Sequence, residues 1–147
     1  MNFDLSEEHL AVKEAARDFA QNVLKPGVIE RDNAQRFPAE EIKQLAELGF
    51  MGMMVDPKYG GSGMDTLAYV LAMEEISKVD ASTSVCMSVN NSLVCWGLET
   101  FGSAEQKAKY LPRLASGEII GSFCLSEPEA GSDATSQATT AVDMGDH

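Results

Sequence analysis

The pattern of apolar and polar residues predicts that the first part of the chain is helical. After Ser6, a good helix N-cap, apolar residues recur at helical spacing and form one apolar face. These residues are Val12, Ala15, Phe19 and Val23. Pro26 ends this helix because it cannot donate the next backbone hydrogen bond. A second helix opens at Pro38, where the missing N–H costs nothing, and closes at Gly49, which suits a left-handed cap.

The stretch from Met51 to Asp65 predicts a long loop, because Pro57, Gly60, Gly61 and Gly63 forbid regular structure. Its glycines could suggest a phosphate cradle, but no Gly-Lys-Ser/Thr follows, so the P-loop pattern fails. A third helix is expected over about 66–79. Its inward residues are expected to be Leu67, Val70, Leu71 and Ile76, and its more exposed ones Glu74 and Glu75.

The next segment, which Asp80 or Ser82 is expected to cap and which reaches Phe101, differs because it has little polar face. A helix that is apolar almost all round is typical of the centre of a bundle, so we expect this segment to be the central helix. Gly102 ends it, and Ser103 with Gln106 forms a capping box for the next helix. That helix contains Pro112, where we expect a break or a kink.

From Ile119 onward the residues become β-branched and small. The pattern predicts a strand over 119–125, a turn, and a second strand over roughly 137–142. We therefore expect a mainly α fold, with an amino-terminal up-and-down helical bundle domain at 1–118. Residues 119–147 are expected to be the first strands of a β domain that is incomplete in this chain.

The charge and the cysteine count exclude several classes of protein. A net charge of −12 argues against nucleic-acid binding and against anionic membrane surfaces, which both need clustered cations. Cys86, Cys95 and Cys124 are odd in number and form no C-x-x-C, so neither a disulfide framework nor a zinc site is indicated. His9 and His147 lie at opposite ends, so no metal site is expected. Without a secretory pattern or a membrane-length apolar stretch, a cytoplasmic location is expected.

The last segment carries the candidate chemistry, although no Lys or Arg follows Arg113. Any anionic group held there must be held by backbone amides and hydroxyls. Ser126 at the end of the expected strand, and Ser132 beside Gly131, supply such groups. An apolar strand that ends in hydroxyls suits the flat, polar-edged ring of a flavin. The same residues also suit an ordinary hairpin turn, so both interpretations remain open at this point.

The sequence around these residues resembles a known family motif. The run from Phe123 to Asp133, FCLSEPEAGSD, is similar to the acyl-CoA dehydrogenase signature, aromatic-C-x-S/T-E-P-x-A-G-S-D. Three other stretches agree with that family in the same order. They are LSEE at 5–8, PKYGGSG at 57–63, and FGS at 101–103 continuing to KYLP at 109–112.

The resemblance implies specific roles. Phe123, Leu125 and Ser126 are expected to contact the flavin of FAD, and Ser132 the CoA part of the substrate. The stripe of Val85, Val89 and Leu93, four residues apart, is expected to line the acyl channel, although bundle core explains that spacing equally well.

The family's reaction removes the α proton and the β hydride of an acyl-CoA, and its electrons pass to electron-transferring flavoprotein. The run SVNNSLV at 88–94 is most similar to short-chain, butyryl-CoA-type members. The family's catalytic glutamate lies in a carboxy-terminal part that has no match here, so no catalytic residue is assigned and the chain alone is expected to be inactive. Complete members are commonly tetramers. The alternatives are an acyl-CoA oxidase or flavin monooxygenase of the same fold, or an isolated, non-catalytic helical binding module.

Overall fold

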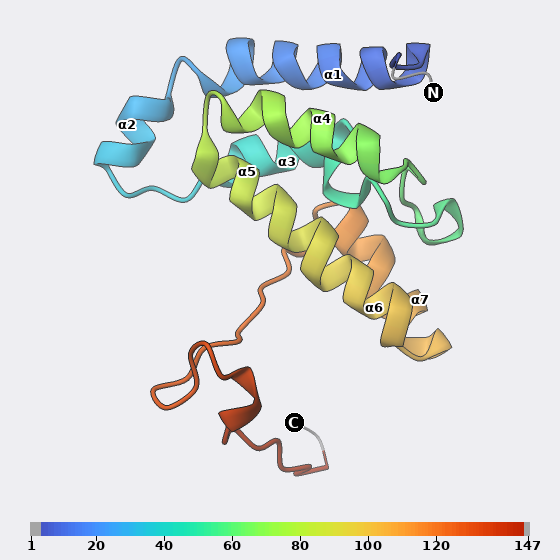
Figure 1. Cartoon of the computed structure of the whole chain (residues 1–147), viewed down its shortest axis with the longest axis vertical. Coiled ribbons are helices and arrows are strands. Elements are labelled where there is room, and N and C mark those ends of the chain that lie inside the picture. The colour runs from blue at the N-terminus through green and yellow to red at the C-terminus, as the bar shows by residue number, and fades with distance from the viewer. Residues whose placement is uncertain (1–3, 146–147) are drawn as a thin grey trace.

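A computed structural model describes residues 4–145, and within that range the protein is a helical bundle followed by an extended carboxy-terminal segment (Figure 1). The mainly α fold expected from the sequence is therefore confirmed. The α-helices are α1 (Glu7–Phe19), α2 (Val28–Asn33), α3 (Ala39–Glu47), α4 (Thr66–Ser77), α5 (Ala81–Ser88), α6 (Trp96–Phe101) and α7 (Ala104–Ala115). Two π-helical stretches, η1 (Ala20–Leu24) and η4 (Val89–Cys95), and three 3-10 turns, η2 (Phe50–Gly52), η3 (Pro57–Tyr59) and η5 (Ala134–Ser136), complete the order.

The predicted helix ends are confirmed by their hydrogen bonds. Ser6 Oγ accepts the His9 amide at 3.2 Å, and Asp80 Oδ1 accepts the Thr83 amide at 3.0 Å at the start of α5. Gly49 has φ of 80°, the left-handed conformation expected after the second helix. The α7 helix runs through Pro112 to Ala115, so the chain is not broken there.

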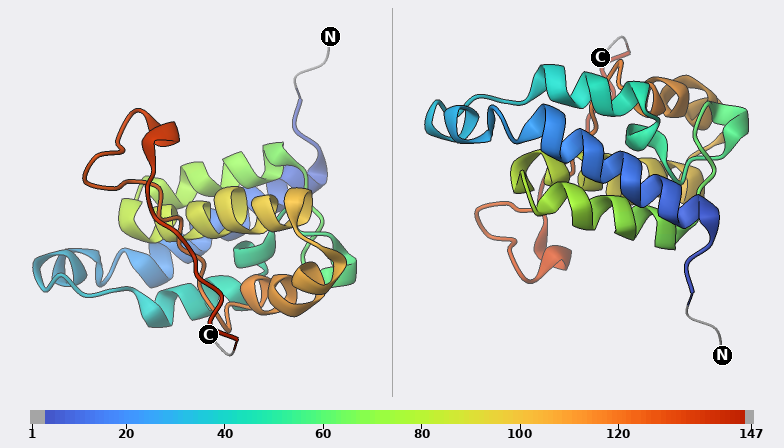
Figure 2. Two further views of the ribbon diagram at one scale, coloured as in Figure 1. Left: turned by 90° about the horizontal axis from the view of Figure 1, so that it is seen from below. Right: turned by 90° about the horizontal axis from the view of Figure 1, so that it is seen from above.

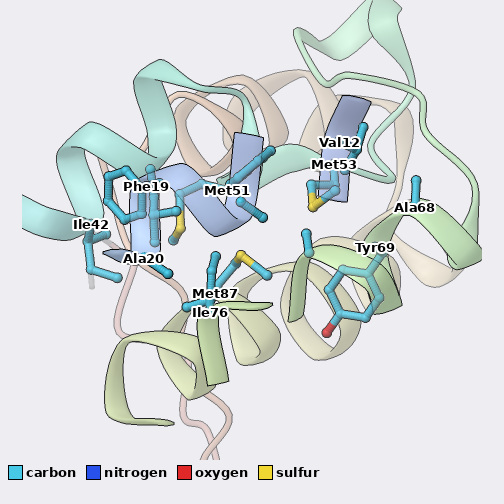
Figure 3. Packing of buried hydrophobic residues seen from close by; sticks show 14 of the residues in the cluster. Val12, Phe19, Ala20, Ile42, Met51, Met53, Ala68, Tyr69, Ile76 and Met87 are labelled. Carbon is cyan, nitrogen blue, oxygen red and sulfur yellow. The ribbon is translucent and has the colours of Figure 1, made fainter. Parts of the chain in front are cut away.

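The main core lies between α1, α3, α4 and α5. The α1 helix packs along α4, and α3 lies on the other side of α1 (Figures 1 and 2). Apolar side chains from these helices and from η2 meet in one cluster (Figure 3). Its largest fully buried members are Leu24, Ile42, Leu45, Met51, Met53, Ile76 and Met87. This packing holds α5 and η4 in place.

The short α2 helix was not expected from the sequence, because its six residues carry no apolar stripe. A buried ionic network holds it instead. The Arg31 guanidinium donates to Glu41 Oε1 at 2.8 Å, to Asp80 Oδ2 at 2.9 Å and to the Leu24 carbonyl at 2.8 Å. This network joins α2 to α3 and to the start of α5.

Three expectations for α4 are wrong. Leu67 and Val70 are exposed, whereas Glu75, expected to be exposed, is buried. The cause is pairing: the Glu75 carboxylate lies 3.3 Å from Arg17 Nε and 3.1 Å from Lys78 Nζ. Because its charge is paired, the Glu75 carboxylate can lie in the interface with α1, where the apolar pattern predicted Leu67 and Val70 instead.

The segment from α5 through η4 to α6 is one continuous helical rod, but it is not buried on every side. Its inner face carries Met87, Asn90, Asn91 and Cys95, whereas Trp96 and Phe101 are exposed. The expectation of a fully surrounded central helix is therefore wrong. The bundle covers one side of the rod, and its outer apolar side remains open.

The two expected strands do not form, because no strand occurs among residues 4–145. The backbone pairing in this region is a single isolated bridge between Glu127 and Ala130. A strand needs a partner for its amides, and here the Glu127 carboxylate accepts the Ala138 and Thr139 amides at 2.7 and 3.1 Å instead. In the described part of the chain, none of the helices has the length and apolarity that crossing a bilayer requires.

Candidate functional site

The candidate site has two parts, and the first is the segment that leaves the bundle after α7. The Ile119 amide donates to the Arg113 carbonyl at 3.2 Å, and the Ile119 side chain packs on a second apolar cluster that includes Leu111 and Leu114. The Gly121 amide then donates to Asn90 Oδ1 at 2.9 Å. Beyond this point the segment extends away from the helices (Figure 1).

The residues predicted to contact a flavin lie on this extending part and are open to solvent. Phe123 is 53% exposed and Leu125 is 40% exposed, although both are large apolar side chains. Within residues 4–145, the backbone amides of Phe123, Leu125 and Ser126 have no hydrogen-bond acceptor, and the Ser126 hydroxyl has no partner. The segment thus presents an apolar surface beside free donors, which is the chemistry that a flavin ring and its edge require.

The turn after this segment is held by two carboxylates. Glu127 accepts hydrogen bonds from Thr139 and from the Ala138 amide, which keep the pKa of Glu127 below its ordinary value. Asp133 accepts from the hydroxyls of Ser136 and Thr135, which lower its pKa in the same way. Both carboxylates therefore stabilise the turn through hydrogen bonds within it. The Ser132 hydroxyl is exposed and, in the part of the chain that the structure describes, has no such bond.

The second part is the stripe on α5 and η4. Val85 is 58% exposed and Leu93 is 42% exposed, and Val89 between them is partly buried. Bundle core, the second interpretation of this spacing, is therefore wrong for Val85 and Leu93. No hydrogen bond or cluster contact joins this stripe to Phe123, Leu125, Ser126 or Ser132 in the described chain.

Two buried residues at the base of the site were missed by the sequence reasoning. Asn90 and Asn91 are adjacent, both are buried, and each side chain makes hydrogen bonds to backbone groups. They lie in η4, and the wide turn of a π-helix, a form often found at functional sites, allows both to face inward. The available signal was a pair of amides inside an otherwise apolar run.

Two hollows of the molecule are lined by none of the predicted site residues. One of about 560 Å³ is lined by residues of α2 and the start of α5, including Arg31, Phe37 and Ser82. Another of about 440 Å³ lies between α1 and α3, beside Phe19 and Leu48. Among residues 4–145 no group of His, Cys, Asp and Glu could hold a metal ion, and His147 lies outside the described residues.

Comparisons with known proteins give matches over most of this chain. A family model described as acyl-CoA dehydrogenase, N-terminal domain, matches residues 6–118. The "Acyl-CoA dehydrogenase, short-chain specific" of Clostridium acetobutylicum is 44% identical over 147 residues, which cover 100% of this chain and 39% of that protein. The "Short-chain specific acyl-CoA dehydrogenase, mitochondrial" of Bos taurus is 48% identical over 97% of this chain and 35% of its own length.

Solved structures give the same result. A chain in the structure of the electron transferring flavoprotein of Acidaminococcus fermentans is 45% identical, with a TM-score of 0.94 over 99% of this chain and 38% of that one. Butyryl-CoA dehydrogenase from Megasphaera elsdenii is 39% identical, with a TM-score of 0.90 over 95% of this chain and 37% of that one. The 147 residues thus span well under half the length of these relatives.

Proposed function

The chain belongs to the acyl-CoA dehydrogenase family, and on this premise we propose that it supplies the helical portion of an FAD-dependent enzyme that desaturates a short-chain acyl-CoA. The observation that carries the proposal is the segment 123–126. Among the described residues 4–145, its amides and the Ser126 hydroxyl have no partner, and Phe123 and Leu125 are exposed beside them.

We assign the flavin contacts to Phe123, Leu125 and Ser126. The amides and the Ser126 hydroxyl would donate to the polar edge of the ring, and the two apolar side chains would cover part of its face. When bound, FAD supplies the acceptor for the β hydride of the substrate. The free Ser132 hydroxyl, on the far side of the turn, would donate to the CoA part of the thioester.

The acyl chain is assigned to the stripe of Val85, Val89 and Leu93. Val85 and Leu93 are exposed and Val89 is partly buried, so the stripe offers an apolar surface on the helical rod, which suits an apolar chain that must be kept from water. A branched side chain at Val89 takes up space and favours a short acyl group. One methylene is worth only about 1–3 kcal/mol in such a pocket, so this preference can change with few substitutions.

The partners follow from the relatives. We propose that the electrons pass to electron-transferring flavoprotein, because a chain of this fold occurs in a structure of such a protein. The complete enzyme is proposed to be a homotetramer. A cytoplasmic location is proposed from the three free cysteines, although the mammalian relatives are named mitochondrial.

The experiment uses a completed enzyme, defined as residues 1–147 joined to the part of the Clostridium acetobutylicum relative that lies beyond its matching 39%. It is expected to purify with bound FAD and to lose flavin absorbance when butyryl-CoA is added without oxygen. The matched control is the same remainder without residues 1–147. Reduction by the control alone, or an FAD-loaded completed enzyme that butyryl-CoA does not bleach, would contradict the proposal.

The same material separates the alternatives. Slow reoxidation of the reduced flavin by air, with fast reoxidation by electron-transferring flavoprotein, indicates a dehydrogenase. Fast reoxidation by air indicates an acyl-CoA oxidase or a monooxygenase. A completed enzyme that folds but never takes up FAD leaves the helical binding module as the better interpretation of the bundle.

A further inference from the structure

We propose that Asn90 and Val94 of η4 position the flavin-contacting segment by clamping Gly121. This inference rests on the proposed function, because it concerns the same segment 123–126. Neither residue is a predicted site residue, and neither reaches the segment's free donors. They act through the backbone at Gly121, two residues before Phe123.

Asn90 supplies the polar half of the clamp. Its side chain is fully buried, and it makes hydrogen bonds to backbone atoms from three different parts of the chain, besides a long bond of 3.8 Å to Cys95 Sγ. The Nδ2 group donates to the Met51 carbonyl at 2.8 Å and to the Leu114 carbonyl at 3.2 Å, while Oδ1 accepts the Gly121 amide at 2.9 Å. The two donor bonds hold the amide group in one orientation, so the acceptor oxygen has a fixed position for Gly121.

Val94 supplies the apolar half, one turn further along η4. A Cβ atom placed on Gly121 would lie 2.7 Å from Val94 Cγ1 and 2.8 Å from Val94 Cβ and Cγ2. Such distances are far inside van der Waals contact, so only glycine allows the backbone to lie this close to the helix. Gly121 is therefore held by a hydrogen bond on one side and by direct packing on the other.

The clamp matters because it is the last fixed point before the free donors. Among residues 4–145, no hydrogen bond ties any residue after Gly121 back to the helices; the later bonds join the segment only to itself. An extended chain advances about 3.3 Å per residue, so the Phe123 amide lies only about 7 Å beyond the clamp. A shift of Gly121 would move the flavin-contacting amides by a similar amount.

Asn91 offers a matched control within the same turn. It is also buried and also makes three bonds to backbone atoms, accepting the Met53 amide at 2.8 Å and donating to the carbonyls of Phe50 at 2.8 Å and Met87 at 3.0 Å. None of these partners lies after α7. Loss of Asn91 should therefore weaken the bundle as much as loss of Asn90, without releasing Gly121.

The first test is amide hydrogen exchange on the 147-residue chain. Asn90→Leu is expected to raise the exchange rate of the Gly121 amide about tenfold or more, the size expected for one lost hydrogen bond. Asn90→Leu and Asn91→Leu are expected to lower the thermal midpoint by similar amounts. Asn91→Leu, however, is expected to leave the Gly121 amide protected from exchange. Equal protection of Gly121 in the two variants would overturn the clamp.

The second test is FAD binding by the completed enzyme. Gly121→Ala keeps all of Asn90's carbonyl partners but pushes the backbone away from Val94, so it is expected to weaken FAD binding about tenfold with little change in thermal midpoint. Removing all three opposing atoms in the Gly121→Ala/Val94→Gly double variant is expected to restore most of that affinity. Unchanged FAD affinity in Gly121→Ala, or no recovery in the double variant, would overturn the inference.

The two ideas fail in different ways. A completed enzyme that takes up no FAD overturns the proposed function, and the role of the clamp in flavin binding with it. In that case the exchange experiment still supports or overturns the clamp itself, because it needs no cofactor. If the completed enzyme binds FAD and neither Asn90→Leu nor Gly121→Ala changes the affinity, the inference is overturned and the proposed function remains.

Discussion

Arg31 and Asp80 lie 49 positions apart in the sequence, and the Arg31 guanidinium donates a 2.9 Å hydrogen bond to the Asp80 carboxylate inside the protein. Glu41 lies on the other side of the same guanidinium at 2.8 Å. All three side chains are buried, so one cation is shared by two carboxylates that solvent hardly reaches. Asp80 also caps α5 through the Thr83 amide. The network therefore joins α2 and α3 to the start of the rod that carries Val85, Val89 and Leu93, the stripe proposed to hold the acyl chain.

Removal of Arg31 is expected to be strongly destabilising. Arg31→Leu leaves two buried carboxylates without their cation, and breaking a buried pair in this way costs about 3–5 kcal/mol. Urea unfolding measures the change in the free energy of unfolding. Arg36→Leu, which alters an exposed arginine five residues later, is the control and should change stability little. Equal effects of the two substitutions would show that the network does not stabilise the fold.

The pH dependence of stability is expected to follow Glu75. Hydrogen bonds from Arg17 hold the pKa of Glu75 below its ordinary value of 4.5, against the opposing effect of burial, and Lys78 adds to the lowering. The folded pKa is thus below the unfolded one. The pairs stabilise the protein fully above pH 4.5, and this contribution is lost as pH falls from there through the folded pKa.

The measurement is urea unfolding at pH 7, 4.5 and 3. Glu75→Gln should lower the free energy of unfolding at pH 7 and reduce its fall between pH 4.5 and 3. Glu74→Gln, on the exposed side of the same helix, should leave that fall unchanged. A Glu75→Gln variant with the full acid dependence of the starting protein would assign the effect to other carboxylates, such as Asp80.

Local signals made much of the bundle predictable. Ser6 and Ser103 were recognisable as caps, Asp80 as one of two candidates, and Gly49 as a left-handed end, because capping depends on residues within one turn. The burial of Glu75 was not predictable, since Arg17, its partner, lies 58 positions away. The α2 helix was missed for the same reason: it depends on Arg31 reaching Asp80.

Part of the candidate site was also predictable from the local sequence, and part depended on distant residues. The motif from Phe123 to Asp133 could be recognised from the sequence. The exposure of Phe123 and Leu125 is consistent with the proposal that they contact a bound flavin. The strand expected there did not form, because no second strand among residues 4–145 satisfies its amides. The hydrogen bond between Asn90 and Gly121 joins residues 31 positions apart, so a local sequence pattern could not predict it.

Substitution of Ser126 tests the flavin site directly. In the completed enzyme, Ser126→Ala removes one hydroxyl donor to the ring and is expected to weaken FAD binding by about 0.5–1.5 kcal/mol. Ser122→Ala is the matched control, because Ser122 is an exposed serine on the same segment but is not assigned to the flavin. FAD titration followed by fluorescence gives both affinities. Equal affinities of the two variants would remove Ser126 from the site.

The 147-residue chain alone is expected to purify without flavin. Its assigned flavin contacts all lie on one exposed segment, 123–126, which extends away from the helices and can cover only one side of a ring (Figure 1). Ligand sites in proteins enclose most of the ligand surface, so one-sided contact gives little affinity. The absorbance spectrum of the purified chain, before and after incubation with FAD and gel filtration, is the measurement. The completed enzyme, treated identically, is the positive control and should retain a flavin spectrum. Stoichiometric FAD that stays with the isolated chain would mean that residues 1–147 form an enclosed site by themselves, and the assignment of the contacts to a one-sided segment would then be wrong.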